Sequence, residues 1–394
     1  MAAHAAAGRG RIHLKPVNIG LIGYRFMGKA HSHAYQDMPF FFHTEHIPVR
    51  KVICGRDERA LREVADRWGW QEVERDWRNI VDRKDIDLID VSAPNALHHD
   101  IVVAAAATGK HIFCEKPLST TVTEAEEMVA AVEQAGVVHM IAHHLRKVPA
   151  LMYARRLIDQ GAIGQVLHMR ALWTNDMAID PEYPLLWRFR RDLGGPSGVI
   201  GDLHSHCIDL ARFLVGEITA VVATADTHIK SRPVPEQSFD RPMGTRGEVT
   251  VPDESCFLAR FANGATGVFE ASWVAAGHKH GQRIEVNGTE GTFLFDFERM
   301  NELEVYLRRD PPSTRGFRRI VVTESEHPYI SAWWPPGHGI TYEHLFIHLV
   351  YEFMDALDRG APPSPNLYDG LIGMRVMAAV ESSVEQRGWV RIEP

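Results

Sequence analysis

The sequence contains few cysteines, no long apolar run and no segment with the pattern of a secretory signal. Its four cysteines, Cys54, Cys114, Cys207 and Cys256, lie far apart without C-x-x-C spacing, which argues against a disulfide framework and against a thiolate zinc site. No apolar stretch approaches the roughly 20 residues of a membrane helix, and residues 1–11 lack the segment order of a secretory signal. We therefore expect a protein of the reducing cytoplasm with no membrane partner.

Blocks of like charge are also missing. Lysine and arginine number 43, aspartate and glutamate 51, so the formal net charge is −8 with histidine neutral. Because no basic cluster recurs along the chain, we expect no nucleic-acid partner.

What the chain does contain is typical of a folded enzyme-sized protein. It has 394 residues, of which 45% are hydrophobic and 24% charged, and this length exceeds what a single hydrophobic core supports. We expect a disordered tail at 1–15, a first domain at 16–141 and a second domain at 142–394.

Short apolar strands alternate with helical stretches in the first domain. Such alternation predicts a doubly wound parallel sheet of the Rossmann type. One of the expected helices, Thr123–Ala135, has Glu126 three residues after a Thr123 cap. The expected strands are 17–23, 49–54, 86–91, 111–114 and 137–141, and the helices between them start at 26, 57, 101 and 123.

The second domain reads as α+β with a large open antiparallel sheet. Turn signals at 262–264 and 287–291 separate strand-like segments, as hairpins require. The Pro- and Arg-rich stretch 230–247 is expected to be a surface loop. Helices are expected at 148–160, 206–214, 342–357 and 368–386.

The first turn, Gly23-Tyr24-Arg25-Phe26-Met27-Gly28, fits G-x-G-x-x-G except that Arg25 replaces the middle glycine. It leaves the first strand and opens a helix, where backbone N–H groups can hold a pyrophosphate. The alternative is a glycine turn without a ligand. After the second strand, Gly55-Arg56-Asp57 stands where dinucleotide folds place a ribose-binding acid, and it leaves NAD and NADP both open.

Two later strands end in polar residues at the carboxyl edge of the sheet. Ser92, Pro94, Asn95 and His98 follow one, and Glu115-Lys116-Pro117 follows the other. An ammonium held there can polarise a substrate hydroxyl. The alternative is a solvated lysine in a turn.

The second domain contributes Gly201-Asp202 and His206 at the start of a helix, with Asp209 one turn later. Imidazole titrates near neutrality and suits a general base that removes a hydroxyl proton. The alternative is a capping or packing histidine. Although the chain has 22 histidines, no ligand spacing such as H-E-x-x-H accompanies them, so we expect no metal.

Together these motifs resemble the Gfo/Idh/MocA family of oxidoreductases, from residue 17 to about 390. The resemblance implies a sugar or cyclitol oxidoreductase with a nicotinamide cofactor, NAD with NADP not excluded, and a homodimer or homotetramer formed through the second domain's sheet. Phe26–Ser32, Leu186–Phe189 and Ala259–Ala265 are similar to a subgroup, the levoglucosan dehydrogenase-like sugar 3-dehydrogenases.

The resemblance also implies roles for individual residues. The catalytic group would be Lys116, His206 and Asp202. Substrate contacts would be His144, Arg146, Asn175, Trp187, Arg188, Asp202 and His206. Cofactor contacts would be Gly23, Arg25, Phe26, Met27, Gly28, Arg56, Ser92, Pro94, Asn95, His98, Glu115 and Lys116.

The resulting hypothesis is oxidation of a pyranose hydroxyl, with carbon 3 as the reacting carbon. The alternative is an NAD-dependent glycoside hydrolase that oxidises carbon 3 transiently, eliminates the aglycone and is then re-reduced. Basic residues that could suit an anionic sugar, if they line the site, are Arg190, Arg191, His278, Lys279 and His280.

Overall fold

A computed structural model describes residues 14–195, 198–235 and 242–393 of the chain, and the side chains of 242–244 are not among the described parts. Most of the expected tail at 1–15 therefore lies outside the described residues, and the first strand already begins at Lys15. Among the helices of the described ranges, none is both long and apolar enough to cross a membrane.

The first domain has a six-stranded parallel sheet with the strand order β3-β2-β1-β4-β5-β6. The predicted doubly wound parallel sheet is confirmed, and β3 is a strand that the sequence analysis did not expect. Its elements, in chain order, are β1 Lys15–Ile22, α1 Phe26–Phe41, β2 His46–Cys54, α2 Glu58–Trp68, β3 Glu72–Glu74, α3 Trp77–Val81, β4 Leu88–Val91, η1 Asn95–Leu97, α4 His98–Ala107, β5 His111–Cys114, α5 Val122–Ala135 and β6 His139–Ile141.

Helix caps fix where the first-domain helices begin. The Asp57 side chain accepts a hydrogen bond from the Ala60 N–H and starts α2. At α5 a capping box joins Thr121 and Glu124, so the predicted Thr123 cap with Glu126 is wrong by two residues. Both pairs share the same spacing, and only the backbone path out of β5 selects between them.

The second domain is built on a nine-stranded sheet with the order β16-β15-β14-β13-β7-β12-β11-β8-β17. Its strands are β7 Val166–Thr174, β8 Ile218–Asp226, β11 Glu254–Phe261, β12 Thr266–Ser272, β13 Gly281–Gly288, β14 Gly291–Asp296, β15 Glu302–Leu307, β16 Arg318–Val321 and β17 Val390–Arg391. The remaining elements are η2 His144–Lys147, α6 Pro149–Asp159, η3 Trp187–Phe189, α7 Arg191–Gly194, η4 Ile200–His204, α8 Ser205–Leu214, η5 Phe297–Arg299, η6 Ile330–Ala332, α9 Tyr342–Arg359 and α10 Leu367–Gln386.

The sheet is mixed rather than wholly antiparallel, because β7 pairs parallel with β12. Both predicted hairpins are present, β11 with β12 and β13 with β14. β7 precedes them in the chain and inserts between them, and turn signals carry no information about such a long-range insertion.

The expected surface loop at 230–247 is wrong in part. β9, Ser231–Pro235, and β10, Pro242–Glu248, pair as a small antiparallel sheet. Arg232 is fully buried, because its guanidinium donates to the carbonyls of Ala178 and Asp180 and lies over the ring of Phe189. The composition of the stretch predicts a solvated arginine, whereas the backbone carbonyls of another segment accept its hydrogen bonds and allow the charge to be buried.

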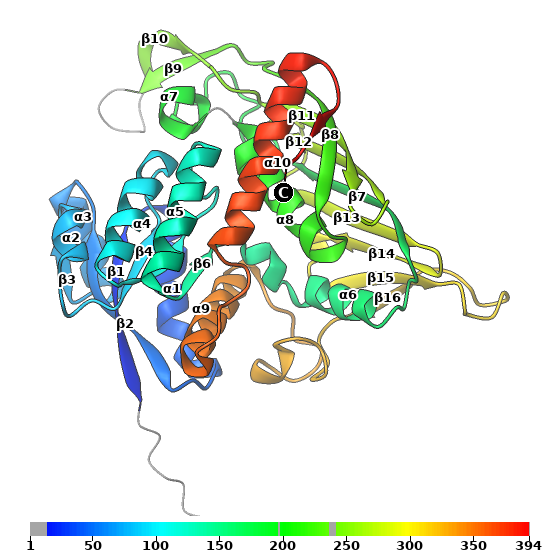
Figure 1. Ribbon diagram of the computed structural model, residues 1–394, viewed down its shortest axis with the longest axis horizontal. Helices are drawn as coiled ribbons and strands as arrows, with labels where there is room; N and C mark the ends of the chain where they lie inside the picture. The colour runs from blue at the N-terminus through cyan, green and yellow to red at the C-terminus, as the bar shows by residue number, and fades with distance from the viewer. Residues whose placement is uncertain (1–13, 196–197, 236–241, 394) are drawn as a thin grey trace, which may run out of the picture.

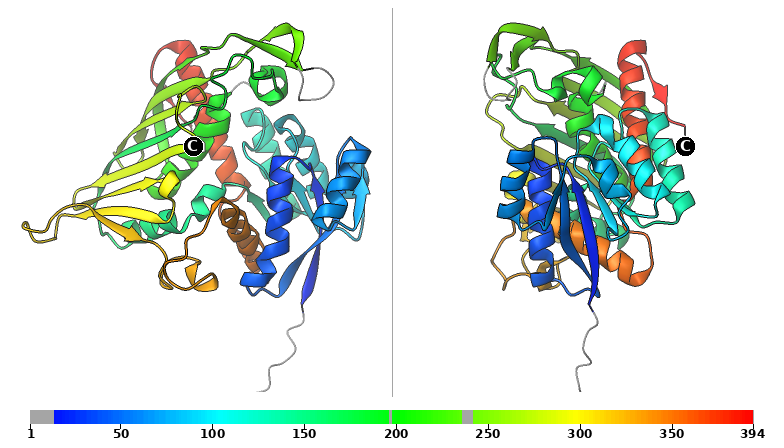
Figure 2. Two further views of the ribbon diagram at one scale, coloured as in Figure 1. Left: turned by 180° about the vertical axis from the view of Figure 1, so that it is seen from behind. Right: turned by 90° about the vertical axis from the view of Figure 1, so that its left-hand side faces the viewer.

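The two domains meet at the carboxyl edge of the parallel sheet. In Figures 1 and 2, α6, α8 and α10 lie on the side of the large sheet that faces the first domain. The chain then returns to that domain, since α9 packs beside α1 and α10 beside α5. This arrangement brings the ends of β4 and β5 close to η4 and α8.

Candidate active site

The turn between β1 and α1 has the shape that a dinucleotide requires. Gly23 has a φ of 114°, and a Cβ placed there would lie 2.4 Å from the Ser92 carbonyl oxygen. A Cβ on Gly28 would lie 2.2 Å from the carbonyl oxygen of Gly23. Arg25 is the N-cap of α1, and its side chain does not cap the N–H groups of the first turn. The residues present therefore fit a pyrophosphate.

The ribose end of this turn is covered by an aromatic ring. Tyr24 packs so closely on Gly55 that a Cβ there would lie 2.2 Å from the ring. Asp57, one possible ribose ligand, is used as the cap of α2, and Arg56 beside it is exposed. Phe26 and Met27 open α1, with the Phe26 ring 67% exposed.

The loops after β4 and β5 are tied together by His98. Its Nε2 lies 2.9 Å from the Ala93 carbonyl oxygen and its Nδ1 3.1 Å from that of Pro117. Pro94 is exposed, and Asn95 begins η1 with its side chain partly buried. His98 is fully buried, so among these predicted cofactor residues it supports the two loops rather than facing the cofactor.

Lys116 reaches from the first domain to the second. Its Nζ lies 2.9 Å from Asp202 Oδ1 and 3.0 Å from the Asp202 carbonyl oxygen. Trp273 Nε1 donates to Asp202 Oδ2 at 3.2 Å, and an Arg188 guanidinium nitrogen lies 3.9 Å from the same oxygen. Burial opposes ionisation, but Lys116 and Arg188 together lower the pKa of Asp202 to about 2. Asp202 is therefore a carboxylate that holds the ammonium in place.

His206 lies at the start of α8 with 2% of its surface exposed. Its ring contacts His144 at 5.1 Å, Trp173 at 5.0 Å and His143 at 5.8 Å between centroids. Burial, followed by the charge of Lys116, lowers the pKa of His206 well below the ordinary value of 6.5. The imidazole is therefore neutral at physiological pH, which is the state that accepts a proton.

The surroundings of His206 form a cluster of neutral rings that we call the neutral histidine cluster: His143, His144, His206, His280 and Trp173. Burial lowers the pKa of His144 to about 3 and that of His280 to about 4. Each of the five rings has at least one buried nitrogen without a hydrogen-bond partner in the described part of the chain. A set of unpaired donors and acceptors so close together suits a polyhydroxylated ligand.

The other predicted substrate residues lie in two different settings. Arg188 lies over the Trp187 ring at 5.6 Å, next to Asp202. Asn175 follows β7, and its Oδ1 accepts from the Met177 N–H. Arg146 lies in the other setting: its guanidinium is buried and is paired with carboxylates.

Arg146 is held by two carboxylates. Its Nε donates to Asp209 at 2.8 Å, and a terminal nitrogen lies 3.1 Å from Asp369. Asp209, one turn after His206, thus pairs with Arg146.

Of the basic residues that would suit an anionic sugar, the structure brings His280 alone to this cluster. His278 and Lys279 are exposed, and Lys279 pairs with Asp176 at 2.8 Å. Arg190 pairs with Asp192 on the surface. Because burial keeps His280 neutral, these residues bring no positive charge to the site.

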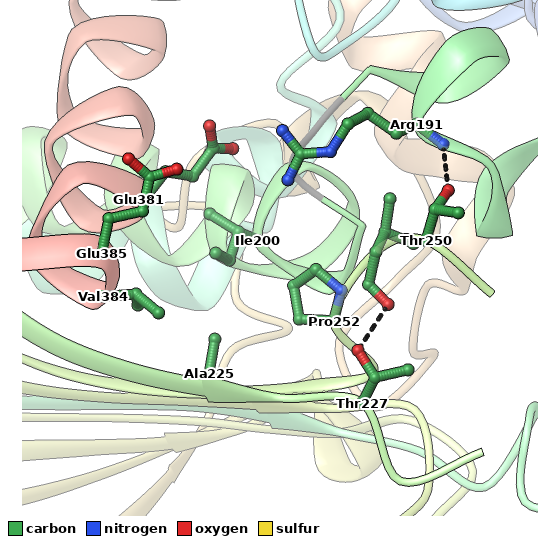
Figure 3. A pocket seen from close by; sticks show the side chains of 10 residues that line it. Arg191, Ile200, Ala225, Thr227, Thr250, Pro252, Glu381, Val384 and Glu385 are labelled. Atoms are coloured by element: carbon green, nitrogen blue, oxygen red, sulfur yellow. Dashed lines mark hydrogen bonds between the residues drawn. The ribbon is translucent and has the colours of Figure 1, made fainter. Parts of the chain in front are cut away.

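Arg191 lines a different cavity, of about 210 Å³, between α10 and β8. Figure 3 shows the carboxylates of Glu381 and Glu385 on one side of this space. Thr227 and Thr250 lie on the other side, and the Thr250 hydroxyl accepts a hydrogen bond from the Arg191 N–H at 2.8 Å. None of the residues that line this cavity is a predicted site residue.

Sequence reasoning missed His143, Trp173, Trp273 and Tyr342 as neighbours of the site. Trp173 is the last residue but one of β7, and Trp273 directly follows β12; these two strands are paired in parallel. Tyr342 begins α9, and its ring contacts His144 at 5.3 Å and Phe26 at 6.3 Å. The two tryptophans could have been found from the sequence only if the pairing of β7 with β12 had been known. Within the described ranges, no group of three or more His, Cys, Asp or Glu side chains is arranged to hold a metal.

Comparisons with known proteins agree with the predicted resemblance. Residues 17–143 match the model of an oxidoreductase family with an NAD-binding Rossmann fold, and residues 151–294 match the GFO/IDH/MocA C-terminal domain. The levoglucosan dehydrogenase of Pseudarthrobacter phenanthrenivorans is 41% identical over 96% of this chain and 99% of that protein. The myo-inositol 2-dehydrogenase of Thermotoga maritima is 25% identical over 96% of this chain and 99% of its own length.

Solved structures show the same likeness. An oxidoreductase domain protein from Kribbella flavida is 46% identical, covers 97% of this chain and 100% of its own, and superposes with a TM-score of 0.92. A levoglucosan dehydrogenase in complex with NADH is 41% identical, with a TM-score of 0.92 over 96% of this chain and 100% of that one. The same enzyme has been solved with NADH and levoglucosan.

Proposed function

The chain belongs to the Gfo/Idh/MocA family of NAD-binding oxidoreductases, and from this premise we propose that it oxidises carbon 3 of a compact, uncharged pyranose sugar such as levoglucosan. The relative that is 41% identical over nearly its whole length is named for that sugar. Among the features of this chain, the observation that carries the proposal is the meeting of Lys116 with Asp202 beside the neutral His206.

The chemistry follows from what these side chains can do. NAD supplies a hydride acceptor when it is bound. Lys116 donates a hydrogen bond to the reacting hydroxyl oxygen and stabilises the negative charge that grows there. His206 takes the hydroxyl proton while the carbon loses its hydride, so a ketone forms.

The remaining residues orient the sugar. Asp202 holds the Lys116 ammonium, and the Arg188 guanidinium next to it can donate to a neighbouring hydroxyl. The nitrogens of His144, His280 and Trp173 that lack partners would exchange hydrogen bonds with other hydroxyls. Positioning of this kind converts an encounter between three groups into an intramolecular step.

The test is NADH formation, followed at 340 nm, with levoglucosan, glucose, methyl glucosides, xylose, myo-inositol and glucuronate. We expect turnover with uncharged pyranoses and little with glucuronate, and NMR of the product should show a ketone at carbon 3. No NADH with any sugar would overturn the proposal, and a ketone elsewhere would overturn the assignment of the carbon. Release of an aglycone without net NADH would replace the dehydrogenase with a redox-cycling glycosidase.

We also propose that the domains divide between residues 141 and 142.

We propose further that the second domain forms a homodimer or homotetramer in the cytoplasm. On the face of the large sheet that points away from the first domain, Leu258 is paired with Val222 on one side and Val268 on the other. Leu258 and Val268 are exposed. Light scattering of the wild type and of Leu258→Asp tests this, and a monomeric wild type would refute it.

A further inference from the structure

Three buried charged side chains lie next to the site, and the proposed reaction does not use them. His31 of α1, Asp90 of β4 and Glu115 at the end of β5 are at most 4% exposed. His31 Nδ1 lies 2.8 Å and 3.0 Å from the two oxygens of Asp90, and its Nε2 lies 3.1 Å from Glu115. We call these residues the His31 triad.

The contacts fix the charge of the imidazole. Both ring nitrogens face carboxylate oxygens, which accept hydrogen bonds and cannot donate them. Both nitrogens must therefore carry a proton, and His31 is an imidazolium. Burial opposes this state, but Asp90 and Glu115 raise the pKa of His31 to about 10. The same pairing lowers the pKa of Glu115 against the effect of burial.

The other donors around the triad are neutral. The Tyr35 hydroxyl donates to Asp90 at 2.7 Å and the Ser92 hydroxyl at 3.1 Å, while the Lys116 backbone N–H donates to Glu115 at 3.1 Å. Two carboxylates thus share one imidazolium, and the triad carries one net negative charge inside the first domain.

The substrate side of the site has the opposite excess. Lys116 and Arg188 share the single carboxylate of Asp202, and the neutral histidine cluster adds no charge. Glu115 is the residue before Lys116, and the two act on the pKa of His144 in opposite directions. The triad, through Glu115, and Lys116 are therefore within electrostatic reach of the same ring.

The nicotinamide ring is cationic when oxidised and neutral when reduced. We propose that the His31 triad offsets the positive charge of Lys116 and Arg188, and that it thereby strengthens the binding of NAD⁺ relative to that of NADH. This inference rests on the proposed function, since it requires Lys116 to face the reacting oxygen. Asp90 and Glu115 would then influence which redox state of the cofactor binds more tightly, in addition to packing in the core of the first domain.

The experiment measures dissociation constants without turnover. NADH binding is followed by its fluorescence, and NAD⁺ binding by displacement of NADH, in the full-length protein. Glu115→Gln removes one negative charge while both oxygens of Asp90 still hold the His31 imidazolium, so the ratio of the NAD⁺ to the NADH dissociation constant should rise about tenfold. Asp90→Asn, measured at a pH low enough to keep His31 protonated, should raise the ratio in the same direction and serves where Glu115→Gln does not fold.

Tyr35→Phe is the matched control, because it removes a buried hydrogen bond to Asp90 without changing any charge. Its ratio should match that of the wild type. A purely structural role for the triad would weaken both cofactors equally, and a ratio within twofold of the wild type in the folded charge variant would overturn the inference. The proposed function would stand in that case, since it fails separately if the wild type oxidises no sugar.

Discussion

Two sets of histidines, His31 in its triad and the neutral histidine cluster, both contact the Phe346 ring and are in opposite charge states. His31 is 5.7 Å from that ring and is held charged between two carboxylates. His144 stacks on the same ring at 4.5 Å and is held neutral by burial. Both groups are buried, so burial does not decide the state; the neighbouring carboxylates do. A histidine's role in this protein follows from its hydrogen-bond partners.

The largest expected effect comes from removing the Lys116 ammonium, whose charge acts on His144 of the neutral group. Lys116→Met should lower kcat about a thousandfold, because the charge on the reacting oxygen loses its donor. NADH binding, measured by fluorescence, should persist. Turnover within tenfold of the wild type would contradict the role of Lys116.

The next largest effect tests the neutral group. His206→Asn should lower kcat by a factor of roughly 10²–10⁴, since the proton loses its acceptor. The matched control is His204→Asn in the preceding turn, because His204 Nε2 bonds the Ser255 carbonyl at 3.1 Å and has no proposed role in the chemistry. Thermal unfolding of both variants distinguishes a loss of chemistry from a loss of folding. If a folded His204→Asn variant lost as much kcat as His206→Asn, the assignment of His206 as the base would fail.

A change of pH should act on the two groups in opposite senses. The pKa of His144 is lowered to about 3, so below pH 6.5 the unfolded chain binds a proton that the native protein excludes. Each such histidine costs about 1.4 kcal/mol of stability per pH unit below 6.5. The pKa of His31 is raised to about 10, so its contribution is complete below pH 6.5 and is lost as the pH rises through 10.

Urea unfolding at pH 6.5 and 5.5 measures this difference. His144→Phe keeps the stack on Phe346 and removes the titrating nitrogens, so its stability should fall by about 1 kcal/mol less than that of the wild type between these two values. Identical losses in both proteins would show that His144 is protonated in the native state.

The smallest effect should come from a change that keeps every charge. Arg188→Lys retains the cation next to Asp202 but loses the planar fork. We expect KM to rise about fivefold with kcat nearly unchanged, and the ratio of NAD⁺ to NADH dissociation constants to stay the same. A changed ratio would show that the relative affinity for NAD⁺ and NADH does not depend on net charge alone.

Much of the fold was accessible from the sequence because it depends on local signals. Apolar runs and turn residues placed β1, β4 and β5 and both hairpins of the large sheet. The register of the α5 cap and the pairing of β7 with β12 were not accessible, since each depends on the path of distant segments. Arg232 was assigned to a solvated loop because its buried carbonyl partners lie some 50 residues away.

The site shows the same division. Lys116 and His206 stand in recognisable motifs, so the sequence marks them singly, and the structure brings them to the same carboxylate and ring cluster. The His31 triad has no motif of its own, because its members are separated by 59 and 84 residues. Arg146 was marked for the sugar by position, whereas the structure places it between Asp209 and Asp369.

The return of α9 and α10 to the first domain has a consequence for how the protein is made. Asp358 of α9 pairs with His46 at 2.6 Å, and Phe353 stacks on Phe113 within the first domain. A ribosome releases this domain long before it has synthesised the helices that complete its surface. Until then, Phe113 lacks a neighbour that it has in the finished protein. The packed surface of the first domain is therefore complete only after α9 and α10, the last two long helices of the chain, have been synthesised.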